Sequence, residues 1–272
     1  MYKLIVVDLD ETLLNDEHQV TVRTIEVIRA VLKKGIRVVF ASGRAQNGIM
    51  KVIELFGTEM HMEYVICFNG AKVQNLKTQE SITDYVLNGS DLKEIYHFVL
   101  QCKLSFYAFD QESIITNQSS KYTFEEAEKN RVQVITKEID SVMDNEKIYK
   151  IVVAGQREAL DRFEKEIPQD FRRRFSVVRS HNNNLEILHP LANKAEALRT
   201  LSKRLKVPLS EIMAFGNANN DIGMVDIAGK GIAMGNAFNK VIEVADYVAD
   251  NNNQDGVGKA LEKFILNQAF DE

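Results

Sequence analysis

The chain has 272 residues, 45% of them hydrophobic and 27% charged, which is typical of a folded globular protein with room for two domains. The formal net charge is −5 and the lysines and arginines are scattered, which argues against a nucleic acid partner. No apolar run approaches the ~18 residues of a membrane helix, and Asp8 and Asp10 interrupt the first apolar stretch, which argues against a signal peptide. We therefore expect a cytoplasmic protein with no membrane contact.

The first part of the chain predicts strands and helices in alternation. Residues 4–7 are a short β-branched run that ends in a polar cluster, as a buried parallel strand does. After it, apolar residues recur at helical spacing, and Gly35 stands where a helix would stop. The elements expected here are a strand at 4–7, a helix at 20–34, a strand at 36–41, a helix at 45–56 and a strand at 64–68.

From about residue 83 this rhythm changes to a mixed pattern. Short alternating runs and turn residues predict more strands per helix than before. The elements expected are a helix at 91–102, a hairpin of 104–109 with 113–116, a strand at 148–153, a helix at 157–167, and strands at 174–179 and 184–188. This segment is typical of an α+β module.

After Lys194 the first rhythm returns, so the middle module is predicted to be an insertion. The elements expected are a helix at 194–205, a strand at 212–215, a helix at 221–228, a strand at 231–234 and a helix from 257. The predicted fold is α/β: a doubly wound, parallel, Rossmann-like core sheet from residues 1–82 and 188–272, with an inserted α+β cap domain over 83–187. Such sheets bind ligands at the carboxyl ends of their strands.

Asp8 and Asp10 follow the first predicted strand, at the edge where a ligand is expected. Two carboxylates separated by one residue can together hold a divalent cation. One can also attack phosphorus and form an acyl phosphate, while the other moves a proton. An isolated Asp-x-Asp is more often a solvated turn, so the interpretation depends on its surroundings.

Three further motifs lie at strand ends. Ser42-Gly43-Arg44 offers a hydroxyl and open backbone amides at a helix start, which can cradle a phosphate or simply cap the helix. Lys194 opens a predicted helix and can neutralise a phosphoryl group, although most lysines are merely solvated. The run 217–221 is dense in oxygen ligands that suit a hard cation, and alone it would fit an Asn-rich cap equally well.

In this order, the four motifs resemble the haloacid dehalogenase-like (HAD) phosphatase superfamily, in its Cof-type branch with the larger α/β cap. The supporting runs are Asn69-Gly70-Ala71, 231–237, 245–248 and 255–257. The resemblance implies an Mg²⁺-dependent phosphatase that hydrolyses small phosphorylated metabolites, such as sugar phosphates or phosphorylated cofactors, through an aspartyl-phosphate.

The resemblance also implies residue roles. Asp8 would be the nucleophile and Asp10 the general acid and then base, with Ser42 and Lys194 stabilising the phosphoryl group. The Mg²⁺ ligands would be Asp8, Asp10, Asn217 and Asp221, and the phosphate or substrate would lie near Gly43, Arg44 and Asn220.

Several positions depart from the family pattern, and Asn217 is the most consequential because the family usually has aspartate there. Glycine is usual where this chain has Glu11, Ala195 and Ala218. Two alternatives remain open: a phosphomutase of the same fold, and a phospho-ligand-binding or regulatory protein impaired by Asn217. The polar run 181–184 can face a substrate, but an exposed turn explains it as well. The sequence leaves both a monomer and a dimer open.

Overall fold

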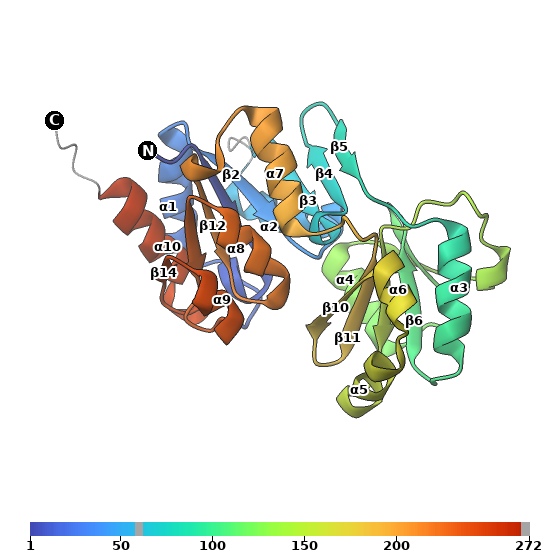
Figure 1. Cartoon of the computed structure of the whole chain (residues 1–272). Coiled ribbons are helices and arrows are strands. Elements are labelled where there is room, and N and C mark those ends of the chain that lie inside the picture. The colour runs from blue at the N-terminus through green and yellow to red at the C-terminus, as the bar shows by residue number, and fades with distance from the viewer. Residues whose placement is uncertain (58–61, 268–272) are drawn as a thin grey trace.

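The computed structural model describes residues 1–57 and 62–267, and its core is an eight-stranded sheet (Figure 1). The strands are β1 Leu4–Val7, β2 Arg37–Ala41, β3 Tyr64–Cys67, β4 Lys72–Asn75, β5 Ser81–Asp84, β12 Ile212–Gly216, β13 Lys230–Ala233 and β14 Tyr247–Val248. Their order is β14-β13-β12-β1-β2-β3-β4-β5. Neighbours from β14 to β3 are parallel, whereas β4 and β5 are antiparallel additions. Central β1 places Leu4 opposite both Ile212 and Arg37.

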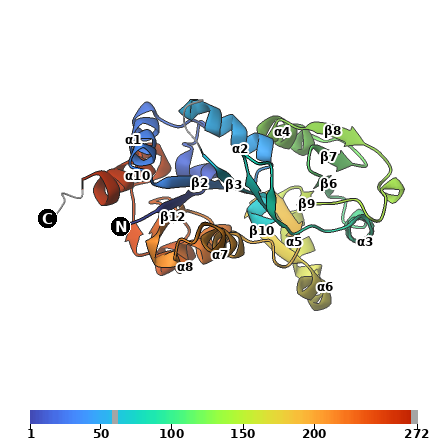
Figure 2. The ribbon, with the colours of Figure 1, turned by 90° about the horizontal axis from the view of Figure 1, so that it is seen from above.

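Helices cover both faces of this sheet, as a doubly wound fold requires. They are α1 Val22–Lys33, α2 Gln46–Ile53, α7 Lys194–Leu205, α8 Ile222–Ile227, α9 Asn239–Val244 and α10 Gly256–Leu261. Figure 2 shows α1, α2 and α10 on one face and α7 and α8 on the other. Val27 and Ile28 of α1 belong to the apolar cluster of the first face, and Leu198 of α7 belongs to that of the second.

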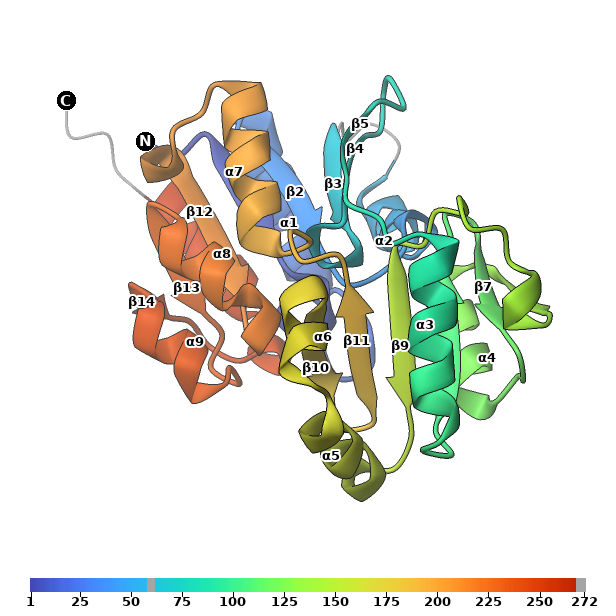
Figure 3. The same ribbon diagram turned by 45° about the vertical axis from the view of Figure 1, so that its right-hand side comes forward.

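A six-stranded sheet forms the inserted cap. Its strands are β6 Ser105–Phe109, β7 Ser113–Thr116, β8 Gln133–Thr136, β9 Lys150–Ala154, β10 Ser176–His181 and β11 Asn184–Leu188, and its helices are α3 Gly89–Leu100, α4 Lys121–Asn130, α5 Arg157–Glu166 and α6 Gln169–Arg174. The strand order is β10-β11-β9-β6-β7-β8. Figure 3 shows α3 and α6 in front of this sheet and α4 behind it.

The two cap faces belong to different apolar clusters. Phe106 and Ile151 pack with α3 and α5 in a cluster confined to the cap. Tyr107, Phe109 and Val152 point to the opposite face and join the cluster that contains Val7 of the core. The cap therefore lies against the core through apolar contact as well as polar contact.

The predicted fold class is confirmed, and most predicted elements are present with shifted ends. For example, α3 begins at Gly89 because Asn88 and Asp91 form a capping box ahead of the predicted start. The elements that the sequence analysis missed are β4, β5, α4, β8, α6, α9 and β14. Most are short, and α4 is largely polar, so their periodicity is weak. Within residues 1–57 and 62–267, no helix is long and apolar enough to cross a membrane.

Candidate active site

A buried ion cluster lies at the carboxyl end of the core sheet. Asp8 directly follows β1, and its side chain is buried. Lys194, the first residue of α7, is fully buried, and its Nζ lies 2.6 Å from Oδ1 of Asp8 and 2.6 Å from Oδ1 of Asp221. Asn193 caps this helix by accepting a hydrogen bond from the Glu196 amide at 2.8 Å, which fixes where Lys194 leaves the backbone.

The ionisation of this cluster reflects two carboxylates facing one ammonium. Burial raises the pKa of Asp8 to about 7, and the negative charge of Asp221 adds to this effect, whereas Lys194 opposes it. Burial alone would lower the pKa of Lys194, but Asp221 and Asp8 together raise it above its ordinary value. The ammonium does not neutralise both carboxylates, so additional positive charge near Asp8 would be stabilising.

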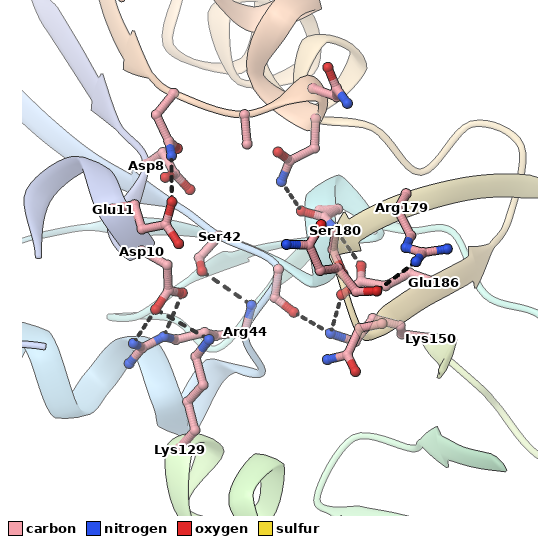
Figure 4. A pocket seen from close by; sticks show the side chains of 18 of the residues that line it. Asp8, Asp10, Glu11, Ser42, Arg44, Lys129, Lys150, Arg179, Ser180 and Glu186 are labelled. Carbon is pink, nitrogen blue, oxygen red and sulfur yellow. Dashed lines mark hydrogen bonds and ion pairs between the residues drawn. The ribbon is translucent and has the colours of Figure 1, made fainter. Parts of the chain in front are cut away.

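Asp10 is held by two cations from different parts of the fold. It lies in the turn Leu9–Leu13, where Glu11 has a φ of 57°. Arg44 donates from Nη2 to Oδ1 at 2.6 Å and from Nε to Oδ2 at 3.0 Å, and Nζ of Lys129 lies 3.2 Å from Oδ1 (Figure 4). Although burial opposes the effect, Lys129 and Arg44 hold the pKa of Asp10 below its usual range. In this arrangement Asp10 is a carboxylate.

At Ser42 and Gly43 the backbone passes close to the side-chain amide of Asn69. The Ser42 side chain is buried, and its Oγ accepts a hydrogen bond from the Arg44 amide at 3.2 Å. A Cβ at Gly43 would lie 3.2 Å from Oδ1 and Nδ2 of Asn69, so a larger residue would crowd this amide. Asn69 Oδ1 accepts a hydrogen bond from Asn220 Nδ2 at 2.9 Å. Asn69 thus connects the end of β2 to the loop after β12.

The loop after β12 is closed by Asp221. Its Oδ2 accepts hydrogen bonds from the backbone amides of Asn217 and Ala218, each at 3.0 Å. A Cβ at Gly216 would lie 2.7 Å from Cγ of Asp221, so glycine is required for this approach. The side-chain Oδ1 of Asn217 accepts a hydrogen bond from Thr12 at 3.1 Å. Both oxygens of Asp221 are therefore engaged, Oδ1 by Lys194 and Oδ2 by the amides of the loop.

Two charged cap residues contact the core at Gly43 and Asn69. Lys150 of β9 and Glu186 of β11 form a buried ion pair of 3.1 Å. Lys150 Nζ also donates to the carbonyl oxygen of Gly43 at 2.8 Å, and Glu186 accepts a hydrogen bond from Asn69 at 2.6 Å. The pair therefore satisfies its buried charges partly through the core.

The end of α4 makes a second connection between cap and core. Three consecutive residues take part: Lys129 with Asp10 at 3.2 Å, Asn130 with the Ala45 amide at 2.6 Å, and Arg131 with Glu54 at 2.8 Å. A Cβ at Gly48 would lie 3.1 Å from Cα of Asn130, so glycine lets α2 and α4 approach closely. This contact places Lys129 over Asp10.

These groups surround a cavity of about 310 Å³ between core and cap (Figure 4). The predicted residues that line it are Asp8, Asp10, Ser42, Gly43, Arg44, Asn217 and Asn220. Lys194 and Asp221 are fully buried beside Asp8. The structure therefore brings all predicted site residues together, while their chemical roles stay predictions. Arg44 was predicted to lie near the phosphate or substrate. It lines the cavity, but its guanidinium pairs with Asp10.

The cap residues of the cavity were largely missed by the sequence analysis. Lys150 and Glu186 each interrupt an otherwise apolar strand, which is the signal that could have revealed them. Lys129 lies in a polar helix and carries no such signal. Asn182 and Asn184 of the polar run line the cavity, whereas the side chain of His181 is outside the described part of the structure.

The cavity offers oxygen donors of the kind that suit a hard cation such as Mg²⁺. Across the described residues, no group of three or more His, Cys, Asp and Glu side chains is arranged as a metal site. The oxygen groups that line the cavity with Asp8 are instead mixed and include the carboxylate of Asp10 and the side-chain amide of Asn217. Lys194 alone faces Asp8 and Asp221, whereas Arg44 and Lys129 both face Asp10, so the unneutralised negative charge lies beside Asp8. A phosphate dianion would add charge that a divalent cation can neutralise.

Comparison with known proteins identifies the family. The chain matches the model of the haloacid dehalogenase-like hydrolases over residues 5–261. It is 34% identical over 268 residues to the Bacillus subtilis (strain 168) protein named "Putative phosphatase YxeH", covering 98% of this chain and 99% of that protein.

Two further comparisons agree with this match. The chain is 29% identical over 271 residues to the 5-amino-6-(5-phospho-D-ribitylamino)uracil phosphatase YcsE of the same Bacillus strain, covering 97% of this chain and 96% of that protein. The crystal structure of a haloacid dehalogenase-like hydrolase from Bacteroides thetaiotaomicron has a TM-score of 0.85 at 30% identity, covering 97% and 99% of the two chains. The chain therefore belongs to the haloacid dehalogenase-like hydrolases, as a phosphatase of the Cof-type branch.

Proposed function

We propose that the protein hydrolyses phosphate monoesters of small polyhydroxylated metabolites through an aspartyl-phosphate on Asp8. The observation that carries this proposal is the buried Asp8 carboxylate at the cavity floor, with one oxygen held by Lys194 at 2.6 Å and Asp10 two residues further on. A fixed carboxylate with one oxygen occupied presents the other in a defined direction, which lowers the entropic cost of attack.

The chemistry divides into two displacements. Asp8 bonds to phosphorus as the ester P–O bond breaks, and Asp10 gives its proton to the departing alkoxide. Asp10 then takes a proton from the water that attacks the acyl phosphate, which releases phosphate and restores Asp8. The buried ammonium of Lys194 stabilises the negative charge that accumulates around the phosphoryl group.

The first displacement requires a proton on Asp10, whereas Arg44 and Lys129 favour its carboxylate. A substrate phosphate entering beside Lys129 competes for that ammonium. The contact between Lys129 and Asp10 then weakens, and Asp10 becomes easier to protonate. Lys129 would therefore couple the occupied cavity to the acid form of Asp10.

Mg²⁺ is part of the proposal, since the donor set and the charge balance both suit it. Asp8, the backbone carbonyl of Asp10 and Asn217 would hold the ion, and Asp221 would keep the loop of Asn217 in place. When bound, Mg²⁺ would neutralise phosphate charge and polarise its oxygens.

The cavity lining supports a polyhydroxylated substrate rather than an aromatic cofactor. Among the described residues, Phe238 is the only aromatic side chain that lines it, and the cap side mainly offers charged and amide groups. At about 310 Å³ the cavity lies near the lower end of the ~300–1,000 Å³ typical of ligand pockets. The relative YcsE is named for 5-amino-6-(5-phospho-D-ribitylamino)uracil, which joins a phosphorylated polyol chain to a uracil ring, so its name supports the polyol phosphate and is neutral on the ring. We propose that the cap domain, residues 83–187, supplies these groups and determines which substrate binds. The core domain, residues 1–82 and 188–272, carries the catalytic residues.

The test is a phosphate-release screen of the purified protein against sugar phosphates, polyol phosphates, flavin mononucleotide and pyridoxal phosphate, with Mg²⁺ and with chelator. We expect release from sugar or polyol phosphates in Mg²⁺ and none in chelator. Asp8→Asn is the matched control, because it removes the nucleophile with almost no change in volume.

Other outcomes would replace the proposal. Release only from the aromatic compounds would overturn the substrate class. Conversion of a hexose phosphate to its isomer without net release would identify a phosphomutase. Binding without turnover at saturating Mg²⁺ would identify a ligand-binding protein disabled at Asn217.

A further inference from the structure

One face of the β4–β5 hairpin is polar where a core sheet would normally be apolar. Lys72 and Gln74 alternate with Val73 along β4, so they share the face opposite to the one on which Val73 packs. Their partners across the antiparallel pairing are Asp84 and Ser81. These four side chains line one cavity, to which the core helix α2 contributes Gln46 and Asn47.

These residues line a second cavity, of about 900 Å³, which we call the hairpin cavity. Its other wall comes from the cap and includes the turn Asp110–Ser113 together with Lys147 and Tyr149. It shares no lining residue with the catalytic cavity. Figure 3 shows the β4–β5 hairpin beside the start of the cap, where the chain passes from core to cap.

Lys72 is the unusual group of this cavity. Its side chain is only 4% exposed, yet no carboxylate among the described residues lies within ion-pair distance of its ammonium. Its ammonium instead lies over the ring of Tyr149, 5.4 Å from Nζ to the centroid. A ring face compensates a buried cation only in part, because burial removes most of the water that would otherwise solvate it.

The carboxylate opposite Lys72 in the sheet already has a cation beside it. Asp84 stands opposite Lys72 in the sheet, but its oxygens accept from Lys147 Nζ and from Tyr149 Oη, each at 2.6 Å. Asp110 in the cap wall is likewise engaged, since its Oδ1 accepts from the Glu112 and Ser113 amides at 2.7 and 2.6 Å. The cavity also holds two carboxylates without an ion pair among the described residues, Asp110 and Glu112, but Asp110 is half-buried and Glu112 is exposed to water. Lys72 is therefore the buried charge of this cavity that lacks a counter-charge within ion-pair distance.

A second group is also unsatisfied. Gln74 is 3% exposed, and its Oε1 has no hydrogen-bond partner in the described structure. Buried amide oxygens are nearly always paired, so a missing donor is expected at this position. An anion at Lys72 that carries a hydroxyl or amino group would supply both missing partners.

We propose that the hairpin cavity is a second binding site, which takes a small anion, phosphate or carboxylate, with hydrogen-bond donors beside the charge. The anion pairs with the Lys72 ammonium, and its donor reaches the amide of Gln74. Because the walls come from both sheets, the bound anion connects core and cap at the point where the chain crosses between them. The site is independent of the proposed phosphatase reaction, since none of its residues takes part in that chemistry.

Isothermal titration of the metal-free protein with inorganic phosphate and, separately, with serine O-phosphate and malate tests the proposal. Lys72→Met removes the charge with similar volume, and Lys77→Met, at an exposed position of the hairpin turn, is the matched control. We expect the control to bind phosphate-bearing probes at two sites and Lys72→Met at one. If the anion is a carboxylate, malate binds once to the control and at least tenfold more weakly to Lys72→Met.

A structural role for Lys72 gives a different result. If Lys72→Met lowers the melting temperature but binds every probe with the stoichiometry and affinity of Lys77→Met, the proposal is overturned. Should Lys72→Met fail to fold, Gln74→Leu provides the second test, because it removes the amide and leaves the charge. Unchanged affinity for serine O-phosphate and malate in Gln74→Leu would then reject the site.

Discussion

Lys129 of the cap lies 3.2 Å from Asp10 of the core, and the two side chains are only 25% and 20% exposed. This ion pair joins the residue proposed as general acid and base to the domain proposed to select the substrate. The two residues that follow Lys129, Asn130 and Arg131, also bind the core. The position of the cap on the core therefore affects the ionisation of Asp10.

Lys129→Met is expected to lower kcat/KM about 10- to 100-fold, because a hydrogen bond to a charged group contributes about 1.5–3 kcal/mol. Since Lys129 lowers the pKa of Asp10, its removal raises that pKa. The acid limb of the kcat profile, where Asp10 must act as a base, should move to higher pH. Lys121→Met, at the exposed start of the same helix, should change neither quantity. If the acid limb of the kcat profile is at the same pH in Lys129→Met as in the natural protein, Lys129 does not control the protonation of Asp10.

Asn217→Asp is expected to lower the Mg²⁺ concentration for half-maximal activity about tenfold. The substitution adds a formal negative charge to a buried donor and keeps an oxygen that can accept from Thr12. Asn219→Asp adds the same charge at an exposed position of the same loop and serves as the control. Coincident Mg²⁺ midpoints for Asn217→Asp and the natural protein would contradict a role of this residue in binding the ion.

Asp8→Asn is expected to abolish turnover and to remove a pH dependence of stability. The folded pKa of Asp8, about 7, lies above the ordinary 3.8, so the folded state binds its proton more tightly. That contribution to stability is complete below about pH 3.8 and is lost as pH rises towards 7. Urea unfolding in chelator should therefore show Asp8→Asn gaining stability relative to the natural protein across this range. Asp226→Asn, at an exposed carboxylate, should show no such gain.

Gly70→Ala is expected to reduce both stability and activity, whereas Gly35→Ala should affect stability alone. Both glycines have positive φ, 97° and 78°, so alanine is strained at either position by about 1–2 kcal/mol. A Cβ at Gly70 would additionally lie 2.3 Å from the carbonyl oxygen of Asn193, and Lys194 would have to shift with it. Thermal unfolding and kcat measured together separate the two effects. Equal kcat in both variants would show that Lys194 tolerates displacement.

The core site could be predicted because its residues follow strands that have strong sequence signals. Asp8 and Ser42 each come directly after an apolar, β-branched run, and parallel strands bring their carboxyl ends to one edge. Lys194 and Asp221 are far from Asp8 in sequence, and the family resemblance was needed to place them together. The structure confirms this proximity through hydrogen bonds of 2.6 Å from Lys194 to each carboxylate.

The cap side of the cavity could not be predicted in the same way. Lys129 and Asn130 end a polar helix, and their contacts depend on Gly48 and on the packing of α4 against α2. The polar strands β4 and β5 were also missed, because Lys72 and Gln74 break the apolar pattern expected of a buried strand. Contacts of this kind arise from tertiary packing, and local periodicity does not encode them.

Apolar contacts hold the cap against the core beside the ion pairs. One of them is the stack of Phe68 in the core on Tyr149 in the cap, with ring centroids 5.0 Å apart. Salt screens ion pairs such as Lys129 with Asp10, whereas sulfate and similar ions strengthen apolar burial. Raising the concentration of a weakly interacting salt would thus release the charged contacts while the ring contact persists. The two halves of the molecule would then remain together but lose the alignment of charges over the cavity, so the enzyme would lose turnover before its halves separate.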